Sequence, residues 1–135
     1  MEFNSQICTS RSQSERLLAL GLKIETADMA YEYKPKHLAD TDIDKDWVIV
    51  AHSPCGTDIP AWSLHRLLCL LPDKTPYSDG YLTVEVINEN VYIVLVIDNV
   101  EQRVLKYTKG NLYDNLISCI NFFVRESLFN KEYLE

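Results

Sequence analysis

The sequence predicts an α+β fold, in which a meander sheet of three or four antiparallel strands packs against about three helices. Two segments, residues 60–71 and 111–128, repeat apolar residues at the three-and-four spacing of a helix that is buried on one side. Between them lie three short runs rich in Val, Ile, Leu and Tyr, separated by turns that contain Asn or Asp. The length of 135 residues fits a single domain spanning residues 1–135.

The first helix is expected to run from near Ser10 to Gly21. Two pairs of residues match a capping box, Ser10 with Gln13 and Ser12 with Glu15, in which each side chain satisfies an orphan backbone amide of the other residue. Gly21 closes the helix, because glycine adopts the left-handed backbone conformation that commonly ends one.

Short strands are expected at residues 31–33 and 47–52, where Tyr, Trp, Val and Ile favour a pleated, packed surface. The acidic segment between them, residues 40–46, resembles the start of a calcium loop. However, Lys45 and Ala51 stand where such a loop needs a turn-forming Gly and a bidentate Glu. We therefore interpret this segment as a solvated acidic loop.

A second helix is expected to begin at Pro60, which suits a first turn, and to stop at Pro72. Its buried stripe comprises Leu64, Leu67, Leu68 and Leu71. Three antiparallel strands follow, at residues 82–87, 91–97 and 103–107. The middle strand is apolar on both faces, so we expect it to be central in the sheet and covered on both sides.

The last helix is expected to run from Asn111 to Leu128, with one broad apolar face that packs on the sheet. This face comprises Leu112, Tyr113, Leu116, Ile117, Ile120, Phe123, Val124 and Leu128. Phe122 and Phe129 lie opposite that face, and two large aromatic residues there suggest a contact patch. The patch is interpreted either as a homodimer or partner interface, or as a surface that another part of the chain covers.

Trp62 and Arg66 form a second candidate partner-binding face, because they are four residues apart and an Arg side chain stacks well on an indole ring. The alternative is structural: Trp62 anchors the start of the second helix against the sheet or the preceding loop.

His52 and Cys55 are the residues that come nearest to a catalytic pattern, with Asp58 three residues further on. A Cys beside a Gly with a nearby His is a candidate thiolate nucleophile, so a small thiol-dependent enzyme is the alternative function. One Cys and one His are too few for a closed zinc site, and no cofactor is expected. A strand end followed by a turn explains the same residues. The four cysteines are expected to be buried thiols: Cys8, Cys55, Cys69 and Cys119.

The net charge of −7 argues against nucleic-acid binding, which needs clustered Lys and Arg. An acidic inhibitor that mimics nucleic acid is a further alternative. The longest apolar run is too short to cross a membrane. The first residues also lack the features of a signal peptide, so a cytoplasmic location is expected.

Three segments together resemble a group of small uncharacterised proteins encoded by prophages and mobile elements of gut bacteria: residues 13–22 (QSERLLALGL) running on to 26–29 (TADM), residues 59–64 (IPAWSL) with the leucines up to Pro72, and residues 113–116 (YDNL). The resemblance implies a setting, and it brings no activity and no catalytic residues. The leading functional hypothesis is therefore a non-enzymatic interaction protein that binds itself or another protein.

Overall fold

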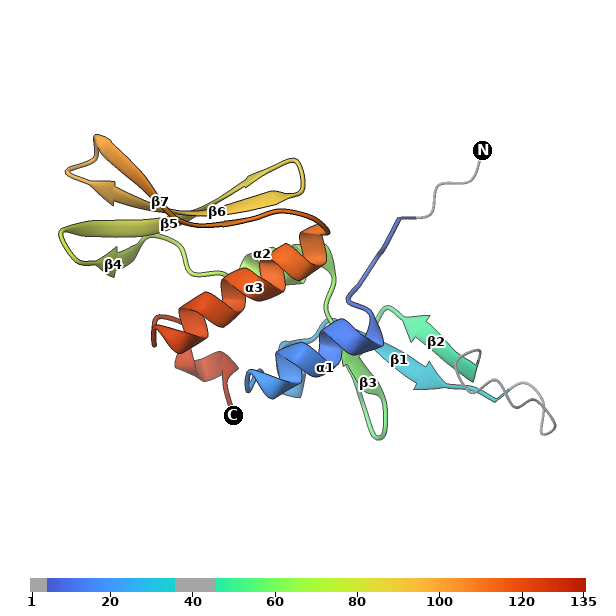
Figure 1. Ribbon diagram of the computed structural model, residues 1–135. Helices are drawn as coiled ribbons and strands as arrows, with labels where there is room; N and C mark the ends of the chain where they lie inside the picture. The colour runs from blue at the N-terminus through green and yellow to red at the C-terminus, as the bar shows by residue number, and fades with distance from the viewer. Residues whose placement is uncertain (1–4, 36–45) are drawn as a thin grey trace. The chain divides into compact units, whose positions relative to one another are not determined.

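The structure is a computed structural model that describes residues 5–35 and 46–135 (Figure 1). The described chain forms two compact units, of which the first ends at Arg66 and includes Glu135, and the second runs from Leu67 to Leu134. Three α-helices and two antiparallel sheets make up these units, which confirms the α+β class. The acidic segment of residues 40–46 lies outside the described residues except for Asp46.

Helix α1 (Arg11–Ala19) begins and ends as the sequence predicts. Ser10 Oγ accepts a hydrogen bond from the Gln13 amide at 3.1 Å, and Gln13 Oε1 accepts one from the Ser10 amide at 2.9 Å. At the other end Gly21 has a φ of 98°, and the amide of Leu22 donates to the carbonyl of Leu17 at 3.2 Å. Both ends of the helix are therefore closed by the local sequence.

The first unit also contains a three-stranded antiparallel sheet in the order β2-β1-β3. Strand β1 (Met29–Tyr33) follows a short 3₁₀ helix, η1 (Ile24–Thr26), and pairs with β2 (Trp47–Val50) and β3 (Ile59–Ala61). The expected strand at 47–52 is thus present but shorter, and the separate small sheet was not anticipated.

Helix α2 (Leu64–Leu70) begins four residues later than the sequence suggested, because Pro60 lies in the edge strand β3 instead of the first helical turn. A proline fits an edge strand because its missing N–H faces away from the neighbouring strand. Ser63 caps the start of the helix, because its Oγ accepts a hydrogen bond from the Arg66 amide at 3.1 Å. Its buried stripe is also different, since Leu70 is buried and Leu68 is 41% exposed.

The second unit contains a four-stranded sheet whose strands follow one another in sequence order, which confirms the meander. Its strands are β4 (Thr75–Tyr77), β5 (Gly80–Ile87), β6 (Asn90–Ile97) and β7 (Glu101–Thr108). Positive φ angles at Asn88, Asp98 and Asn99 form the predicted turns. Within this sheet, only β4 was not predicted from the sequence; it is a three-residue strand with a proline in its middle.

Helix α3 (Leu112–Arg125) packs along one face of this sheet and contacts β6 (Figure 1). Most of its predicted apolar face is buried, including Tyr113, Leu116, Ile117, Ile120 and Phe123. Strand β6 is flanked by β5 and β7 and buries side chains of both faces, as predicted. Ile93 lies on the α3 side of the sheet, because its partner Lys106 donates from Nζ to the Ser118 carbonyl in α3. Val94 lies on the other face with Tyr92, whose ring stacks on that of Tyr107 with centroids 4.8 Å apart. A second 3₁₀ helix, η3 (Lys131–Tyr133), follows α3.

Candidate functional site

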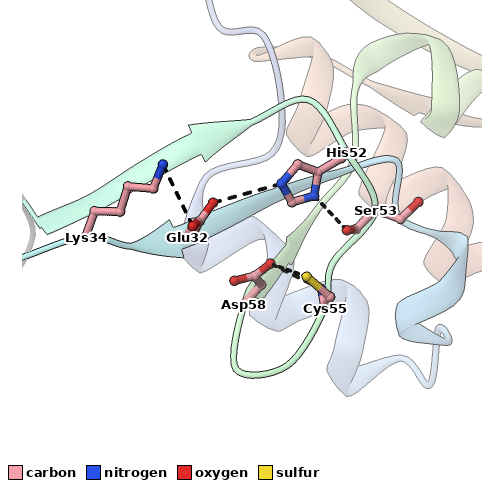
Figure 2. Close-up of polar contacts among 6 residues, drawn as sticks. All are labelled: Glu32, Lys34, His52, Ser53, Cys55 and Asp58. Carbon is pink, nitrogen blue, oxygen red and sulfur yellow. Dashed lines mark hydrogen bonds and ion pairs between the residues drawn. The ribbon is translucent and has the colours of Figure 1, made fainter.

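The loop between β2 and β3 folds back on itself and brings Cys55 beside Asp58 (Figure 2). The Cys55 amide donates to Asp58 Oδ2 at 3.1 Å, and the Asp58 amide donates to the Cys55 carbonyl at 3.1 Å. Between them Gly56 has a φ of 60°, a conformation that glycine adopts without strain. Two reciprocal hydrogen bonds therefore fix the spacing of these two side chains.

His52 completes a cluster of three chemically different side chains at this loop. One nitrogen of the His52 ring, Cys55 Sγ and one oxygen of Asp58 all lie within 4.8 Å of one another. His52 and Cys55 are exposed and Asp58 is half-buried. The structure therefore brings together the two residues that the sequence singled out, together with the nearby aspartate.

Glu32 extends the cluster from strand β1, which lies far from the loop in sequence (Figure 2). Its Oε2 is 3.9 Å from Nε2 of His52, and its Oε1 is 3.8 Å from Nζ of Lys34. The second ring nitrogen of His52, Nδ1, lies 2.9 Å from the Ser53 carbonyl oxygen. The sequence analysis missed Glu32, because the pairing of β1 with β2 is what places it beside the loop.

The electrostatics of the cluster do not favour a thiolate at Cys55. The thiol donates a hydrogen bond to Asp58 Oδ2 at 3.5 Å, and this bond raises the pKa of Cys55 above its ordinary value. The negative charges of Asp58 and Glu32 raise the pKa further. A nucleophilic cysteine needs the opposite, a neighbour that lowers its pKa, so this arrangement does not support the thiol-enzyme hypothesis.

The other cysteines divide between the interior and the surface. Cys8 and Cys119 are buried, whereas Cys55 and Cys69 are exposed, so the expectation of four buried thiols is wrong for the latter two. Burial raises the pKa of Cys119 to about 12 and also raises that of Cys8. The two buried thiols therefore remain protonated at neutral pH.

Trp62 is an anchor of the first unit and is fully buried. Its indole Nε1 donates to Thr26 Oγ1 at 3.0 Å, and its backbone amide donates to Thr9 Oγ1 at 3.1 Å. Arg66 is half-buried, and its Nε donates to the Thr26 carbonyl at 2.6 Å. Trp62 is thus buried in the structural role that the alternative interpretation gave it, and it does not present an exposed face beside Arg66.

Phe122 and Phe129 do not form an exposed patch in the second unit. Phe129 is only 4% exposed and its ring lies 5.9 Å from that of Tyr133. Phe122 is half-buried, with Nζ of Lys106 at 6.0 Å from its ring centre. The chain itself therefore covers the Phe129 ring and leaves the Phe122 ring partly exposed, so the two rings do not form one exposed patch.

The second unit instead presents a groove beside β5, whose lining exposes at least as much polar as apolar surface. It has a volume of about 240 Å³. Its lining residues come from the end of α2, the segment after it and β5: Leu68, Leu71, Pro72, Asp73, Thr83, Val84 and Val86. Asp73 is the one charged residue in this lining.

The groove runs beside the part of β5 that follows Leu82. On the side away from β6, this part of β5 has no strand partner among the described residues. Strand β4 pairs with β5 only from Gly80 to Leu82. The hairpin between them is closed by the pair Tyr77 and Gly80, so Gly80 and Leu82 direct their N–H and C=O groups toward β4. Backbone groups that face one side recur at every second residue of a strand. The N–H and C=O groups of Val84 and Val86 therefore face the same side as those of Gly80 and Leu82, but beyond the end of β4.

Comparisons with protein-family models, curated proteins and solved structures found no match to this chain. Within the described residues, no helix combines the length and the apolar character that are needed to cross a membrane.

Proposed function

We propose that this protein is a non-enzymatic interaction protein, which binds an extended segment of another protein as an additional strand on the outer edge of β5. The observation that carries the proposal is the outward-facing backbone of Val84 and Val86 beside a groove of mixed polar and apolar lining. In strand addition, backbone hydrogen bonds supply affinity and a pocket for alternate side chains supplies specificity. Both parts are present on the same stretch of β5.

The side chains of the groove indicate which segment fits. Val84 and Val86 alternate along β5, and Leu68, which is 41% exposed, lies across from them on α2. A partner segment with apolar residues at every second position would therefore direct them into the groove. Asp73 in the lining and the net charge of −7 favour a segment that also carries Lys or Arg.

The same charge disfavours a second copy of this chain as the occupant, because two molecules of charge −7 repel each other at neutral pH. The opposite edge of the sheet is also less suited to pairing. Strand β7 carries Arg103 and Lys106, and charged side chains of this kind protect an edge from another strand. We propose that the partner is a host or phage protein met in the cytoplasm, as the sequence resemblance implies.

A peptide-display selection against the immobilised full chain tests this proposal. We expect the selected peptides to alternate apolar residues and to carry a basic residue. Their affinity should fall about tenfold or more for Val86→Lys and for Leu68→Glu, each of which replaces an apolar side chain of the groove with a charged one. Val104→Lys is the matched control, because Val104 is 58% exposed on β7 and lies outside the groove.

Amide hydrogen exchange provides the decisive signature. In the unbound protein the amides of Val84 and Val86 should exchange faster than those of Thr83 and Glu85, which face β6. A selected peptide at saturation should protect Val84 and Val86 specifically. Peptides that bind without protecting these amides, or that bind Val86→Lys as well as wild type, would show that the edge is not the binding site.

A further inference from the structure

The cluster on the β2–β3 loop contains three donor groups that proteins use for transition metals. These are an imidazole, a thiol and a carboxylate, supplied by His52, Cys55 and Asp58. Zinc in proteins is held by this set of donor types, with distances of about 2.3 Å to sulfur and about 2.0–2.2 Å to nitrogen or oxygen. The aspartate is the third ligand that a count of Cys and His alone does not include.

The spacing of the donor atoms fits one ion. In a tetrahedral site with those bond lengths, a sulfur and an oxygen ligand are about 3.6 Å apart. Cys55 Sγ and Asp58 Oδ2 are 3.5 Å apart, and all three donor atoms lie within 4.8 Å of one another. An ion therefore requires only a small inward movement of side chains that are exposed or half-buried.

The surroundings of His52 also resemble those of a metal ligand. A histidine that binds a metal usually gives its other ring N–H to a carboxylate or a backbone carbonyl. His52 Nδ1 lies 2.9 Å from the Ser53 carbonyl oxygen, so one ring nitrogen of His52 already has a backbone partner of this kind. Glu32 lies 3.9 Å from Nε2 and adds negative charge on that side of the cluster.

From this geometry we propose that His52, Cys55 and Asp58 bind one divalent transition-metal ion of the zinc type, with water in the fourth position. The ion replaces the hydrogen bond between the thiol and Asp58, and the thiol proton is released to solvent as the sulfur–metal bond forms. The site would link the end of β2 to the start of β3. It is independent of the strand edge in the second unit, so the two proposals can fail separately.

Cobalt(II) substitution tests the site directly on the reduced, metal-free full chain. We expect one equivalent of Co²⁺ to produce the thiolate-to-cobalt charge-transfer band and the visible bands of a tetrahedral ion, and Zn²⁺ to displace it. Cys55→Ser should abolish the charge-transfer band. His52→Ala and Asp58→Asn should each weaken Co²⁺ binding. Losing an outer-shell partner of a metal ligand costs about 10- to 100-fold in affinity, and losing a direct ligand should cost at least as much.

Cys69→Ser is the matched control, because Cys69 is likewise an exposed cysteine but belongs to α2. This variant should bind Co²⁺ as wild type does. The proposal is overturned if wild type shows no thiolate–cobalt band at millimolar Co²⁺. It is also overturned if the band survives in Cys55→Ser and disappears in Cys69→Ser.

Discussion

At the C-terminal end of α3, Ser127 adopts a left-handed conformation with a φ of 58°. The Leu128 amide donates to the Phe123 carbonyl at 2.8 Å, and the Ser127 amide donates to the Val124 carbonyl at 3.1 Å. This is the helix-closing motif that Gly21 forms after α1, here formed by a residue with a side chain. The backbone strain at Ser127 is therefore a local property that one substitution can relieve.

Ser127→Gly is expected to stabilise the protein by up to about 1 kcal/mol. A left-handed residue other than glycine costs about 1–2 kcal/mol, and the larger freedom of glycine in the unfolded chain offsets part of the gain. Urea denaturation measures the change in the free energy of unfolding. Ser127→Ala keeps the strain and should not stabilise, so a Gly variant no more stable than the Ala variant would contradict this account.

Cys55 provides a second residue-scale prediction, which concerns the pH dependence of its reactivity. Because Asp58 raises the pKa of Cys55, less thiolate is present at a given pH than in a model thiol. In the presence of a chelator, Cys55 should therefore alkylate more slowly than a model thiol. Asp58→Asn should move the pH–rate profile to lower pH and accelerate the reaction at pH 8, as measured by peptide mass spectrometry.

The alkylation rate of Cys55 also tests the thiol-enzyme hypothesis. Alkylation of Cys55 faster than the model thiol, lost in His52→Ala, would show that His52 activates the sulfur. Cys69 serves as the internal reference because the same peptide map reports an exposed cysteine outside the cluster.

At the scale of elements, the apolar face of α3 is expected to carry much of the stability of the second unit. Ile120 is fully buried, so Ile120→Ala should destabilise by about 2–5 kcal/mol, the usual cost of removing a large buried aliphatic side chain. Val100 is 85% exposed in a turn, and Val100→Ala should remain within about 0.5 kcal/mol of wild type. Equal urea midpoints for the two variants would contradict the observed packing.

The elements that were predicted correctly are those with local signals. α1 has its capping box and Gly21, and α3 and β5–β7 have long periodic patterns between turn residues. The start of α2 was wrong because Pro60 suits both a helical first turn and an edge strand. Pairing of Pro60 with Ala30 in β1 decides between them, and residues thirty apart in sequence give no local sign of that contact.

At the scale of the whole chain, the sites too depend on contacts between residues that are distant in sequence. His52, Cys55 and Asp58 lie close in sequence, so their proximity was foreseeable although their convergence was not. The pairing of β1 with β2 places Glu32 beside His52. The groove lies where β4 ends, next to Val84 and Val86, which have no strand partner on that side within the described part of the chain. The ring of Phe129 contacts that of Tyr133, which follows the helix whose periodicity was analysed.

Net charge and the open edge together predict how the protein behaves as pH falls. At pH 7 the charge of −7 opposes association between copies, but near the isoelectric point of about 4.9 that repulsion disappears. The outward backbone of Val84 and Val86 would then pair between molecules, as unprotected edges do. Sedimentation at several pH values should show wild type associating near pH 5 and remaining monomeric at pH 7.

Val86→Lys should suppress that association, because a lysine on the edge opposes the pairing of another strand. Val100→Lys changes the net charge by the same amount at an exposed turn, so it separates the effect of the edge from the effect of charge. If both variants associate equally near pH 5, the contact lies elsewhere on the surface. If only Val86→Lys remains monomeric near pH 5, the copies associate through the edge of β5 that we propose as the partner site. Charge repulsion at neutral pH would then prevent that same edge from pairing between copies.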